Sequence, residues 1–273
     1  MLQSALRFAW LLTFSLGVFA NSFDDTQPRM VVVIDDLGNN LQQGQASLAL
    51  PGPVTYAFLP HTRYSEALVQ QAHSLGKEVM LHAPMENTHQ LKLGPGALTE
   101  SLSEIEFKRV LNESLQSIPY AVGINNHMGS LLTQQALPMQ WVMDIVAEKG
   151  IFFLDSRTTA KSVAWDVAKK RNIPVLQRDV FLDHEQTPEF LQQQFFRAVH
   201  IARKYGSVIV IGHPYAVTTS FLEEAIPALD EAGIQLVSAS ALLLQQKVLR
   251  DQLESDKEQI LSECDTLEGH ECR

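Results

Sequence analysis

The sequence has little cysteine, and its two cysteines, Cys264 and Cys272, both lie near the C-terminal end. Most of the chain can therefore hold neither a disulfide framework nor a cysteine-based metal site. In an exported protein the two thiols are expected to form a disulfide that closes a short loop of the tail. Free thiols are the alternative.

Basic residues are also scarce, because 21 Lys and Arg stand against 31 Asp and Glu, for a formal net charge of −10. A chain of this charge gains little from the release of counterions from a phosphate backbone. We therefore expect no nucleic acid among its partners.

A long hydrophobic run is missing as well. The apolar stretch from Phe8 to Phe19 has about twelve residues, whereas a membrane-spanning helix needs roughly 20. It follows Arg7 and ends in Val18-Phe19-Ala20, a pattern typical of a secretory signal peptide. We predict a signal peptide over residues 1–20, a secreted or periplasmic protein, and no membrane span after cleavage. An uncleaved anchor or a disordered N-terminus is the alternative.

Short β-branched runs alternate with longer segments of helical period over most of the chain. This alternation is typical of βα units and of a parallel sheet. It predicts an α/β fold, a (β/α) barrel with seven or eight mostly parallel strands, over residues 29–245, followed by a polar C-terminal tail over residues 246–273. The expected strands are 30–34, 54–58, 78–81, 122–125, 151–154, 175–180, 207–211 and 234–237.

Helices are expected where glycine follows an amphipathic segment, at 65–75, 138–149 and 221–232. Ser103 and Glu106 have the spacing of a capping box and predict a further helix start. Residues 241–253 are expected to form a last helix that packs against the barrel through Leu243, Leu244 and Val248. The segment between residues 82 and 102 is expected to be a long loop.

Titratable side chains follow most of the expected strands. The carboxyl ends of the strands of a parallel barrel open onto one mouth, where active sites of barrel enzymes lie. No requirement of fold stability explains acids and imidazoles at so many of these ends. These residues are Asp35 and Asp36, His61, His82, His127, Asp155, Asp179 and Asp183, and His213.

Converging imidazoles and carboxylates are ligands that a divalent metal ion accepts, and Zn²⁺ in particular binds mixed nitrogen and oxygen sets. A neighbouring carboxylate and an opposing histidine can then serve as general base and general acid. Each element also has a simpler explanation. Asp35 and Asp36 can be a helix cap or a polar turn, and a single histidine is more often a surface or hydrogen-bonded residue.

Five segments in order resemble the motifs of the divergent polysaccharide deacetylase family, a branch of the NodB-homology fold. The resemblance spans roughly Arg29 to Gln245 and implies the deacetylase barrel of that fold. The segments are Val31-Val32-Val33-Ile34-Asp35-Asp36-Leu37-Gly38, His82-Ala83-Pro84-Met85-Glu86, Gly123-Ile124-Asn125-Asn126-His127-Met128-Gly129-Ser130, Leu154-Asp155-Ser156-Arg157-Thr158 and Ile211-Gly212-His213-Pro214.

The resemblance implies that Asp35 is the general base, Asp36 a metal ligand and His213 the general acid. Related deacetylases have a second histidine four residues after the first, but here Glu86 follows His82 at that spacing. Either Glu86 replaces that ligand or His127 reaches in from the next strand. We favour Asp36, His82 and His127, because three protein ligands and a water are the usual catalytic arrangement of zinc.

Asp155 is expected to orient His213 or raise its pKa, and Arg157 to hold a carboxylate or a substrate oxygen, although a structural ion pair explains both residues equally well. The leading hypothesis is a metal-dependent hydrolase, with Zn²⁺ as the expected metal, that removes N-acetyl groups from a cell-envelope or extracellular polysaccharide such as peptidoglycan. The alternatives are a non-catalytic envelope protein that binds carbohydrate with the same fold, and a metallohydrolase of another substrate class.

Overall fold

The structure is a computed structural model that describes the backbone of residues 27–266 and the side chains of residues 27–258. The predicted signal peptide over residues 1–20 lies outside the described residues. The predicted disulfide also does, because Cys272 and the side chain of Cys264 are not among them.

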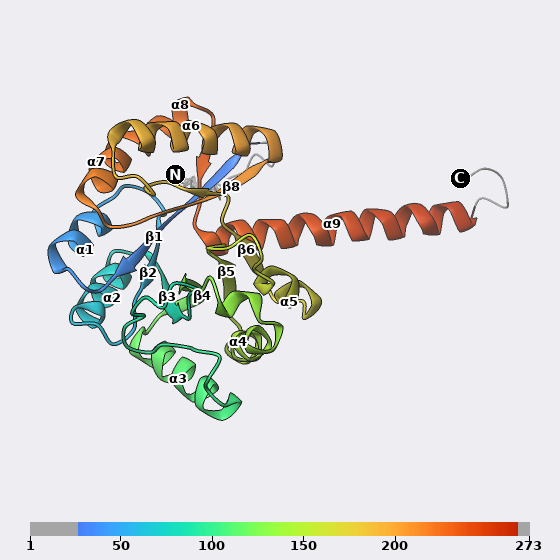
Figure 1. The fold of residues 1–273 in the computed structure, drawn as a ribbon. Helices are drawn as coiled ribbons and strands as arrows, with labels where there is room; N and C mark the ends of the chain where they lie inside the picture. The colour runs from blue at the N-terminus through green and yellow to red at the C-terminus, as the bar shows by residue number, and fades with distance from the viewer. Residues whose placement is uncertain (1–26, 267–273) are drawn as a thin grey trace, which may run out of the picture.

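Within residues 27–266, nine strands form one parallel sheet that curls into a barrel surrounded by helices (Figure 1). The order along the sheet is β6-β5-β4-β3-β2-β1-β8-β7, and β9 pairs with the first residues of β1. The predicted (β/α) barrel is confirmed. The strands are β1 Arg29–Leu37, β2 Thr55–Phe58, β3 Glu78–Met85, β4 Ala121–Met128, β5 Phe152–Asp155, β6 Val175–Gln177, β7 Val180–Phe181, β8 Ser207–Gly212 and β9 Gln235–Leu236.

Helices cover the outside of this sheet, and several begin and end where the sequence predicts. Ser103 forms a complete capping box with Glu106 at the start of α3, and Gly150 ends α4 in the left-handed conformation that suits glycine. The helices are α1 Leu41–Leu48, α2 Ser65–Ser74, α3 Glu104–Ser117, α4 Ala136–Lys149, α5 Ala164–Lys170, α6 Pro188–Tyr205, α7 Ala216–Ala225, α8 Ala228–Glu231 and α9 Ala239–Thr266, with a short 3₁₀ turn at Leu132–Gln134.

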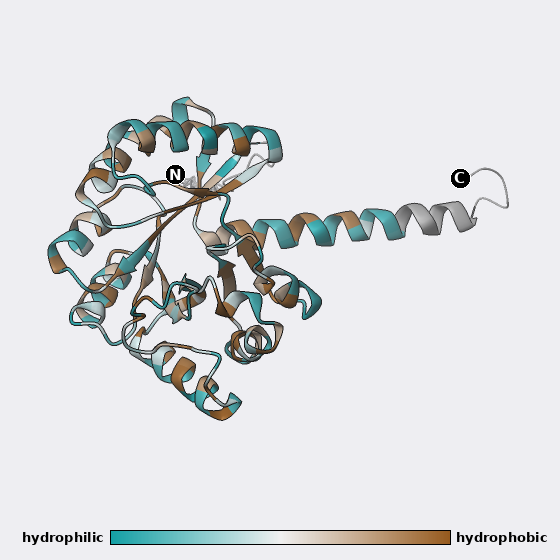
Figure 2. Ribbon diagram, viewed as in Figure 1, coloured by the Kyte–Doolittle hydropathy of each residue, from teal (hydrophilic) through white to brown (hydrophobic). Residues whose placement is uncertain are grey.

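The hydrophobic core has two parts, because alternate residues of each strand point to opposite faces of the sheet. One set faces the surrounding helices, and the other fills the inside of the barrel, where Val31, Met80 and Ile211 are fully buried. Ala239 and Leu242 of α9 belong to the inner set. The first turn of α9 therefore closes the barrel at the amino ends of the strands. Figure 2 shows the apolar strands inside and the polar outer faces of the helices.

Two predicted elements are divided in the structure. The expected strand 175–180 is two strands, because the chain leaves β5 at Arg178 and Asp179 and β7 pairs with β8 instead. The nitrogen of Ile209 donates to Asp179 Oδ2 at 2.8 Å and fixes this crossing. The expected helix 221–232 is α7 followed by α8, because Pro227 lies between them and cannot donate a helical hydrogen bond.

The last helix is longer than predicted. Residues 246–273 were expected to form a polar tail and the helix to end near Leu253, but α9 continues to Thr266 and projects away from the barrel (Figure 1). Gln, Glu, Lys and Leu are good helix formers, and no glycine or proline interrupts them before Gly269. Within residues 27–266, no helix is long and apolar enough to cross a membrane.

Candidate metal and catalytic site

A cavity of about 190 Å³ lies at the carboxyl ends of the strands. Five of the predicted site residues line it: Asp35, Asp36, His82, His127 and His213. Asn126, Met128, Ser156, Thr158 and Phe181 complete the wall. These residues come from β1, β3, β4, β7 and the loops after β5 and β8, so the parallel barrel gathers side chains that are distant in the sequence.

Both carboxylates of the Asp35-Asp36 pair reach this cavity, although neighbouring residues of a regular strand point to opposite faces. The pairing of β1 with β2 shifts register between Ile34 and Leu37, and Asp36 has a φ of 61°. Aspartate adopts this left-handed conformation more readily than most residues. The irregular end of β1 therefore turns two successive acids into one site.

The structure brings together three potential metal ligands, Asp36, His82 and His127. The Oδ1 atom of Asp36 lies 2.8 Å from Nδ1 of His127 and 3.1 Å from Nε2 of His82, and the two ring nitrogens are 3.1 Å apart. Ligand atoms of a tetrahedral zinc ion, with bonds of about 2.0–2.1 Å, are separated by roughly 3.3 Å. The donor types and their spacing thus fit a divalent metal ion.

The buried Asp36 Oδ1 atom has no polar partner among the described residues other than these two imidazoles. Burial opposes the charge of Asp36, but the imidazoles of His127 and His82 outweigh it and hold the pKa of this carboxyl well below its usual range. Asp36 is therefore ionised, as a carboxylate ligand of a metal ion must be.

A hydrogen bond from the neighbouring strand orients His82. Its Nδ1 atom lies 2.7 Å from the amide oxygen of Asn125, while the amide nitrogen of Asn125 donates to Asp35 Oδ1 at 2.7 Å. An amide oxygen only accepts, so Nδ1 of His82 donates this hydrogen bond, and Nε2 is the ring nitrogen that can bind a metal. Asn125 thereby fixes a metal ligand and the candidate base together.

Asp35 is almost completely buried, with 2% of its surface exposed. Burial raises the pKa of Asp35, although the charges of His82 and His213 and the hydrogen bond from Asn125 act in the opposite direction. Its Oδ1 atom is occupied by Asn125, whereas Oδ2 lies 3.7 Å from Nε2 of His82. Oδ2 is the oxygen that remains free to accept a proton in the cavity.

His213 is held by Asp183 rather than by Asp155, which corrects the prediction that Asp155 orients it. Asp183 accepts from Nδ1 of the ring at 2.8 Å and from the backbone nitrogen of His213 at 2.6 Å. Asp155 instead accepts from the nitrogen of Arg157 and from Ser162, each at 2.8 Å, and so shapes the turn after β5. The expected catalytic role of Asp155 thus lacks the contact that it requires.

The charge of Asp183 also affects the titration of His213. Burial lowers the pKa of the imidazole, but the hydrogen bond and charge of Asp183 outweigh this effect and raise the pKa to about 9, with help from Asp36. The Nε2 atom lies 4.0 Å from Asp36 Oδ2. Protonated Nε2 therefore faces the group of potential ligands.

Glu86, the alternative ligand, points elsewhere. Its carboxylate accepts from the backbone nitrogen of Glu100 at 2.8 Å and so ties the start of the loop after β3 to its end. In the part of the chain with described side chains, the only group of three acids or imidazoles suited to a metal is Asp36, His82 and His127. The guanidinium of Arg157 donates to Gln177 at 3.3 Å, and it forms no ion pair with a carboxylate among the residues whose side chains are described.

The sequence does not indicate the roles of two polar residues of the site. Asp183 stands among the strand-end acids, but the sequence does not reveal which acid contacts which histidine. Asn125 follows Ile124 within an expected strand, and an amide at a buried strand position indicates a need for hydrogen-bond partners.

Comparison with known proteins finds relatives over most of the chain. Residues 32–243 match a family model described as divergent polysaccharide deacetylase. An uncharacterized protein of Haemophilus influenzae is 37% identical over 238 residues, which cover 87% of this chain and 84% of the relative. The uncharacterized protein YibQ of Escherichia coli is 35% identical over 246 residues, covering 90% of this chain and 75% of the relative.

Among solved structures, that of an uncharacterized protein from Agrobacterium tumefaciens has a TM-score of 0.77 and 25% sequence identity. The match covers 79% of this chain and 89% of that one. The family model extends from β1 to the first turns of α9, so it includes every residue of the candidate site.

Proposed function

The chain belongs to the divergent polysaccharide deacetylase family, and from that premise we propose that it is a metal-dependent hydrolase that removes N-acetyl groups from a cell-envelope or extracellular polysaccharide. One observation carries the proposal. Asp36, His82 and His127 converge on one point, with Asp35 beside His82 and His213 beside Asp36. A metal-binding group flanked by a candidate base and a candidate acid is the arrangement that amide hydrolysis requires.

Asp36, His82 and His127 would hold the metal. A divalent cation such as Zn²⁺, when bound there, supplies a water of lowered pKa and polarises the carbonyl oxygen of the acetamido group. The protein's part is to keep Asp36 ionised and His82 in the correct tautomer, which the two imidazoles and Asn125 do.

Asp35 would act as the base. Its Oδ2 atom accepts a proton from the attacking water while Asn125 holds Oδ1 in place. The raised pKa of Asp35 makes it a better proton acceptor than an exposed carboxylate. The water oxygen forms the new bond to the carbonyl carbon, and the C–N bond of the amide breaks in the following step.

His213 would act as the acid. Because Nδ1 donates to Asp183, the proton that leaves is on Nε2, which faces the cavity. It passes to the amine nitrogen as that nitrogen departs, so the products are acetate and a free amino sugar. A pKa of about 9 keeps this proton on His213 at neutral pH.

A non-catalytic carbohydrate-binding protein is the second candidate. The glutamate at position 86, in place of a second histidine, favours it, because this is where the chain departs from the motif of related deacetylases. A cavity of about 190 Å³ admits an acetamido group under either hypothesis. Only the release of acetate distinguishes the two.

The proposed location is the periplasm or the outside of the cell, supported by the signal-peptide pattern of residues 1–20. The mature chain is expected to begin at or near Asn21. The intact mass of the protein recovered from the cell envelope checks this, and retention of Met1 would contradict it.

The function is tested by metal analysis and acetate release. The purified chain is expected to bind one divalent ion and to release acetate from N-acetylated glycans, including peptidoglycan fragments. Asp36→Asn, His82→Ala and His127→Ala are each expected to weaken metal binding by about 100-fold or more. Asn is chosen at position 36 because it tolerates the φ of 61°.

Glu86→Gln is the matched control and should retain the metal, since Glu86 bonds to the backbone outside the ligand group. If Glu86→Gln loses the metal while His127→Ala keeps it, the assignment of His127 is wrong. If the metal-loaded chain releases no acetate from any glycan, the carbohydrate-binding alternative replaces the enzyme.

A further inference from the structure

A second hollow lies at the opposite end of the barrel from the candidate catalytic site. It has a volume of about 380 Å³ and lies between the end of α5, the chain entering β6, and the first turns of α9. Because β6 begins at Val175, this hollow is at the amino ends of the strands, whereas the cavity with Asp35 and His213 is at the carboxyl ends. The two sites share no residue.

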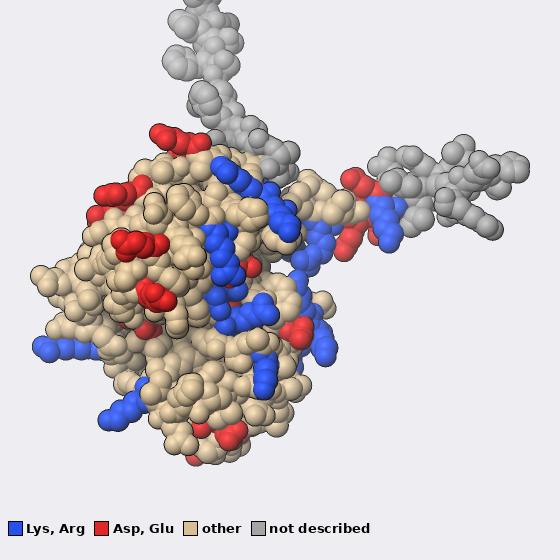
Figure 3. Space-filling model, turned by 45° about the horizontal axis from the view of Figure 1, so that its top comes forward, with Lys and Arg blue, Asp and Glu red and all other residues tan. Residues whose placement is uncertain are grey.

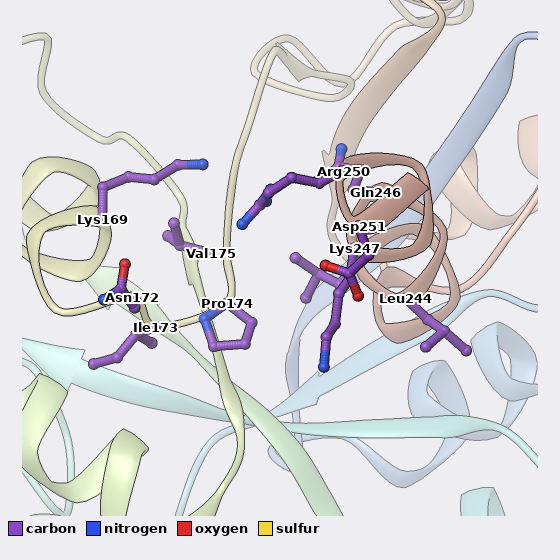
Figure 4. Close-up of a pocket in the computed structure, with 11 residues that line it drawn as sticks. Lys169, Asn172, Ile173, Pro174, Val175, Leu244, Gln246, Lys247, Arg250 and Asp251 are labelled. Atoms are coloured by element: carbon purple, nitrogen blue, oxygen red, sulfur yellow. The ribbon is translucent and has the colours of Figure 1, made fainter. Parts of the chain in front are cut away.

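Cations dominate this hollow, although the protein as a whole has a formal charge of −10. Lys169 comes from α5, and Lys247 and Arg250 come from α9; Asp251 is the one acidic residue of the lining. Figure 4 shows Lys169 and Arg250 reaching toward each other across the opening. In Figure 3, many Lys and Arg side chains gather on the side of the molecule from which α9 projects.

None of these three cations forms an ion pair with any residue whose side chain the structure describes. Cations elsewhere on the surface do form ion pairs, as Lys108 does with Asp144. Like charges that face each other repel, and an anion between them removes the repulsion and binds both. Three cations and one carboxylate leave a formal excess of two positive charges.

Helix stability alone accounts for only part of this arrangement. Lys169 lies in the last turn of α5, where a cation interacts favourably with the helix dipole, and its ammonium lies 4.7 Å from the ring centre of Trp165. Lys247 and Arg250 lie in the first half of α9, far from its C-terminal end, so the dipole does not explain them. A ligand that binds cations on both walls of the hollow does explain their positions.

The floor of the hollow is apolar. Ile173, Pro174, Val175 and Leu243 line it beside the charged groups. A ligand that fits this lining combines an anionic group with an uncharged portion that packs on the floor. Arginine holds the oxygens of a phosphate with two parallel hydrogen bonds, and a phosphate near neutral pH carries close to two negative charges.

We propose that the hollow between α5 and α9 binds a phosphate group, with Lys169 on one wall and Lys247 and Arg250 on the other. The group belongs either to a water-soluble phosphate or to the headgroup of an anionic phospholipid, since the same three side chains serve both. The proposal is independent of the deacetylase function, because it concerns the opposite end of the barrel.

The test measures binding by the full purified chain at constant ionic strength. One arm titrates inorganic phosphate against a chloride reference by calorimetry. The other arm sediments the chain with phosphatidylglycerol vesicles or with phosphatidylcholine vesicles. Arg250→Ala and Lys169→Gln, one from each wall, are each expected to weaken binding about tenfold. Asp251→Asn removes the carboxylate and is expected to strengthen binding a few-fold.

Lys257→Ala is the control, because it removes a cation from the same helix outside the hollow. Binding in either arm that Arg250→Ala and Lys169→Gln lose and Lys257→Ala keeps supports the proposal, and the arm that responds identifies the source of the phosphate. Absence of binding in both arms overturns it. An equal loss in all three variants overturns it too, since that result indicates diffuse surface charge.

Discussion

The two ends of the barrel both gather charged side chains, but they do so in opposite ways. At the carboxyl ends, hydrogen bonds between polar side chains hold the imidazoles in place, as Asp183 does for His213 and Asn125 for His82. At the amino ends, Lys169, Lys247 and Arg250 extend from two helices without an ion pair among the described side chains. The side chains at the carboxyl ends are ordered without a ligand, whereas those at the amino ends need a ligand to order them.

Burial explains this difference. Asp35 and His82 have only 2% of their surface exposed, so each must have hydrogen-bond partners to offset the loss of water. The lysines and the arginine of the hollow are exposed, and water satisfies them in the absence of a ligand. Precise positioning, which catalysis needs, is thus available only at the carboxyl ends.

The largest expected effect separates proton transfer from metal binding at the carboxyl end. Asp35→Asn and His213→Ala should each lower the rate of acetate release by about 10²–10⁴-fold, because a general base or acid acts only on the reaction. Metal content should remain stoichiometric, since neither residue belongs to the group of three ligands. Steady-state kinetics together with metal analysis of the same preparations measure both quantities.

Lys257→Ala provides the control for that comparison, because this exposed residue lies on the projecting part of α9 and lines neither site. It should retain full turnover. If Asp35→Asn and His213→Ala keep full turnover as well, their proposed roles in proton transfer are wrong, even with the metal in place.

The second effect concerns the closure of the barrel by α9 at the amino ends of the strands. Leu242 of α9 is buried inside the barrel with 2% of its surface exposed, whereas Leu253 on the projecting part is 70% exposed. Leu242→Ala should lower the free energy of unfolding by about 2–5 kcal/mol, because it leaves a cavity in the inner core. Leu253→Ala should change it by less than about 0.5 kcal/mol.

Denaturant unfolding of both variants measures this difference. Equal losses would mean that the outer half of α9 contributes to the folded core, contrary to its projection from the barrel in Figure 1. A negligible loss for Leu242→Ala would mean that the first turn of α9 does not close the barrel.

The sequence predicts the fold well because local signals and the barrel agree. Glycine after a helix, as at Gly150, and the capping box of Ser103 act over a few residues, so both are readable without tertiary structure. The break of the expected strand at Arg178 and Asp179 is not readable, because it depends on the pairing of β7 with a distant strand.

The candidate site is predictable in composition but not in its contacts. That acids and imidazoles follow parallel strands indicates that they share a mouth. It does not indicate that the acid facing His213 is Asp183 rather than Asp155, because the sequence does not give the strand order that places β7, and not β5, beside β8. Nor does the sequence show the backbone turn at Asp36, which brings two neighbouring acids to one side of the sheet.

The third effect is a change in pH dependence at the carboxyl end. As a general acid, His213 must be protonated, so activity should fall as the pH rises through its pKa of about 9. Asp183→Asn removes the charge that raises this pKa, and the alkaline limb should move to lower pH by about one unit or more. The pH profile of turnover measures the shift, which a purely structural role of Asp183 would not produce.

The same ion pair should also make stability pH-dependent. The pKa of His213 is higher in the folded protein than the ordinary 6.5, so its contribution is complete below about pH 6.5 and is lost as the pH rises through about 9. Asp183→Asn should reduce this loss between neutral and alkaline pH. An alkaline limb that stays in place in Asp183→Asn would contradict the assignment of His213 as the acid.

The smallest expected effect uses salt to compare the two ends directly. Screening weakens interactions between exposed charges, and the Debye length falls from about 10 Å at 0.1 M to about 3 Å at 1 M ionic strength. Phosphate binding in the exposed hollow should therefore weaken a few-fold over this range, measured by calorimetry with added sodium chloride. The ion pair of His213 with Asp183 is shielded from the ions, because the Asp183 side chain is fully buried, so the alkaline limb should move by only a few tenths of a pH unit. If the limb moves as strongly as phosphate affinity does, salt reaches the catalytic cavity as freely as the hollow. Burial would then not explain why the side chains of the catalytic cavity are ordered without a ligand while those of the hollow are not.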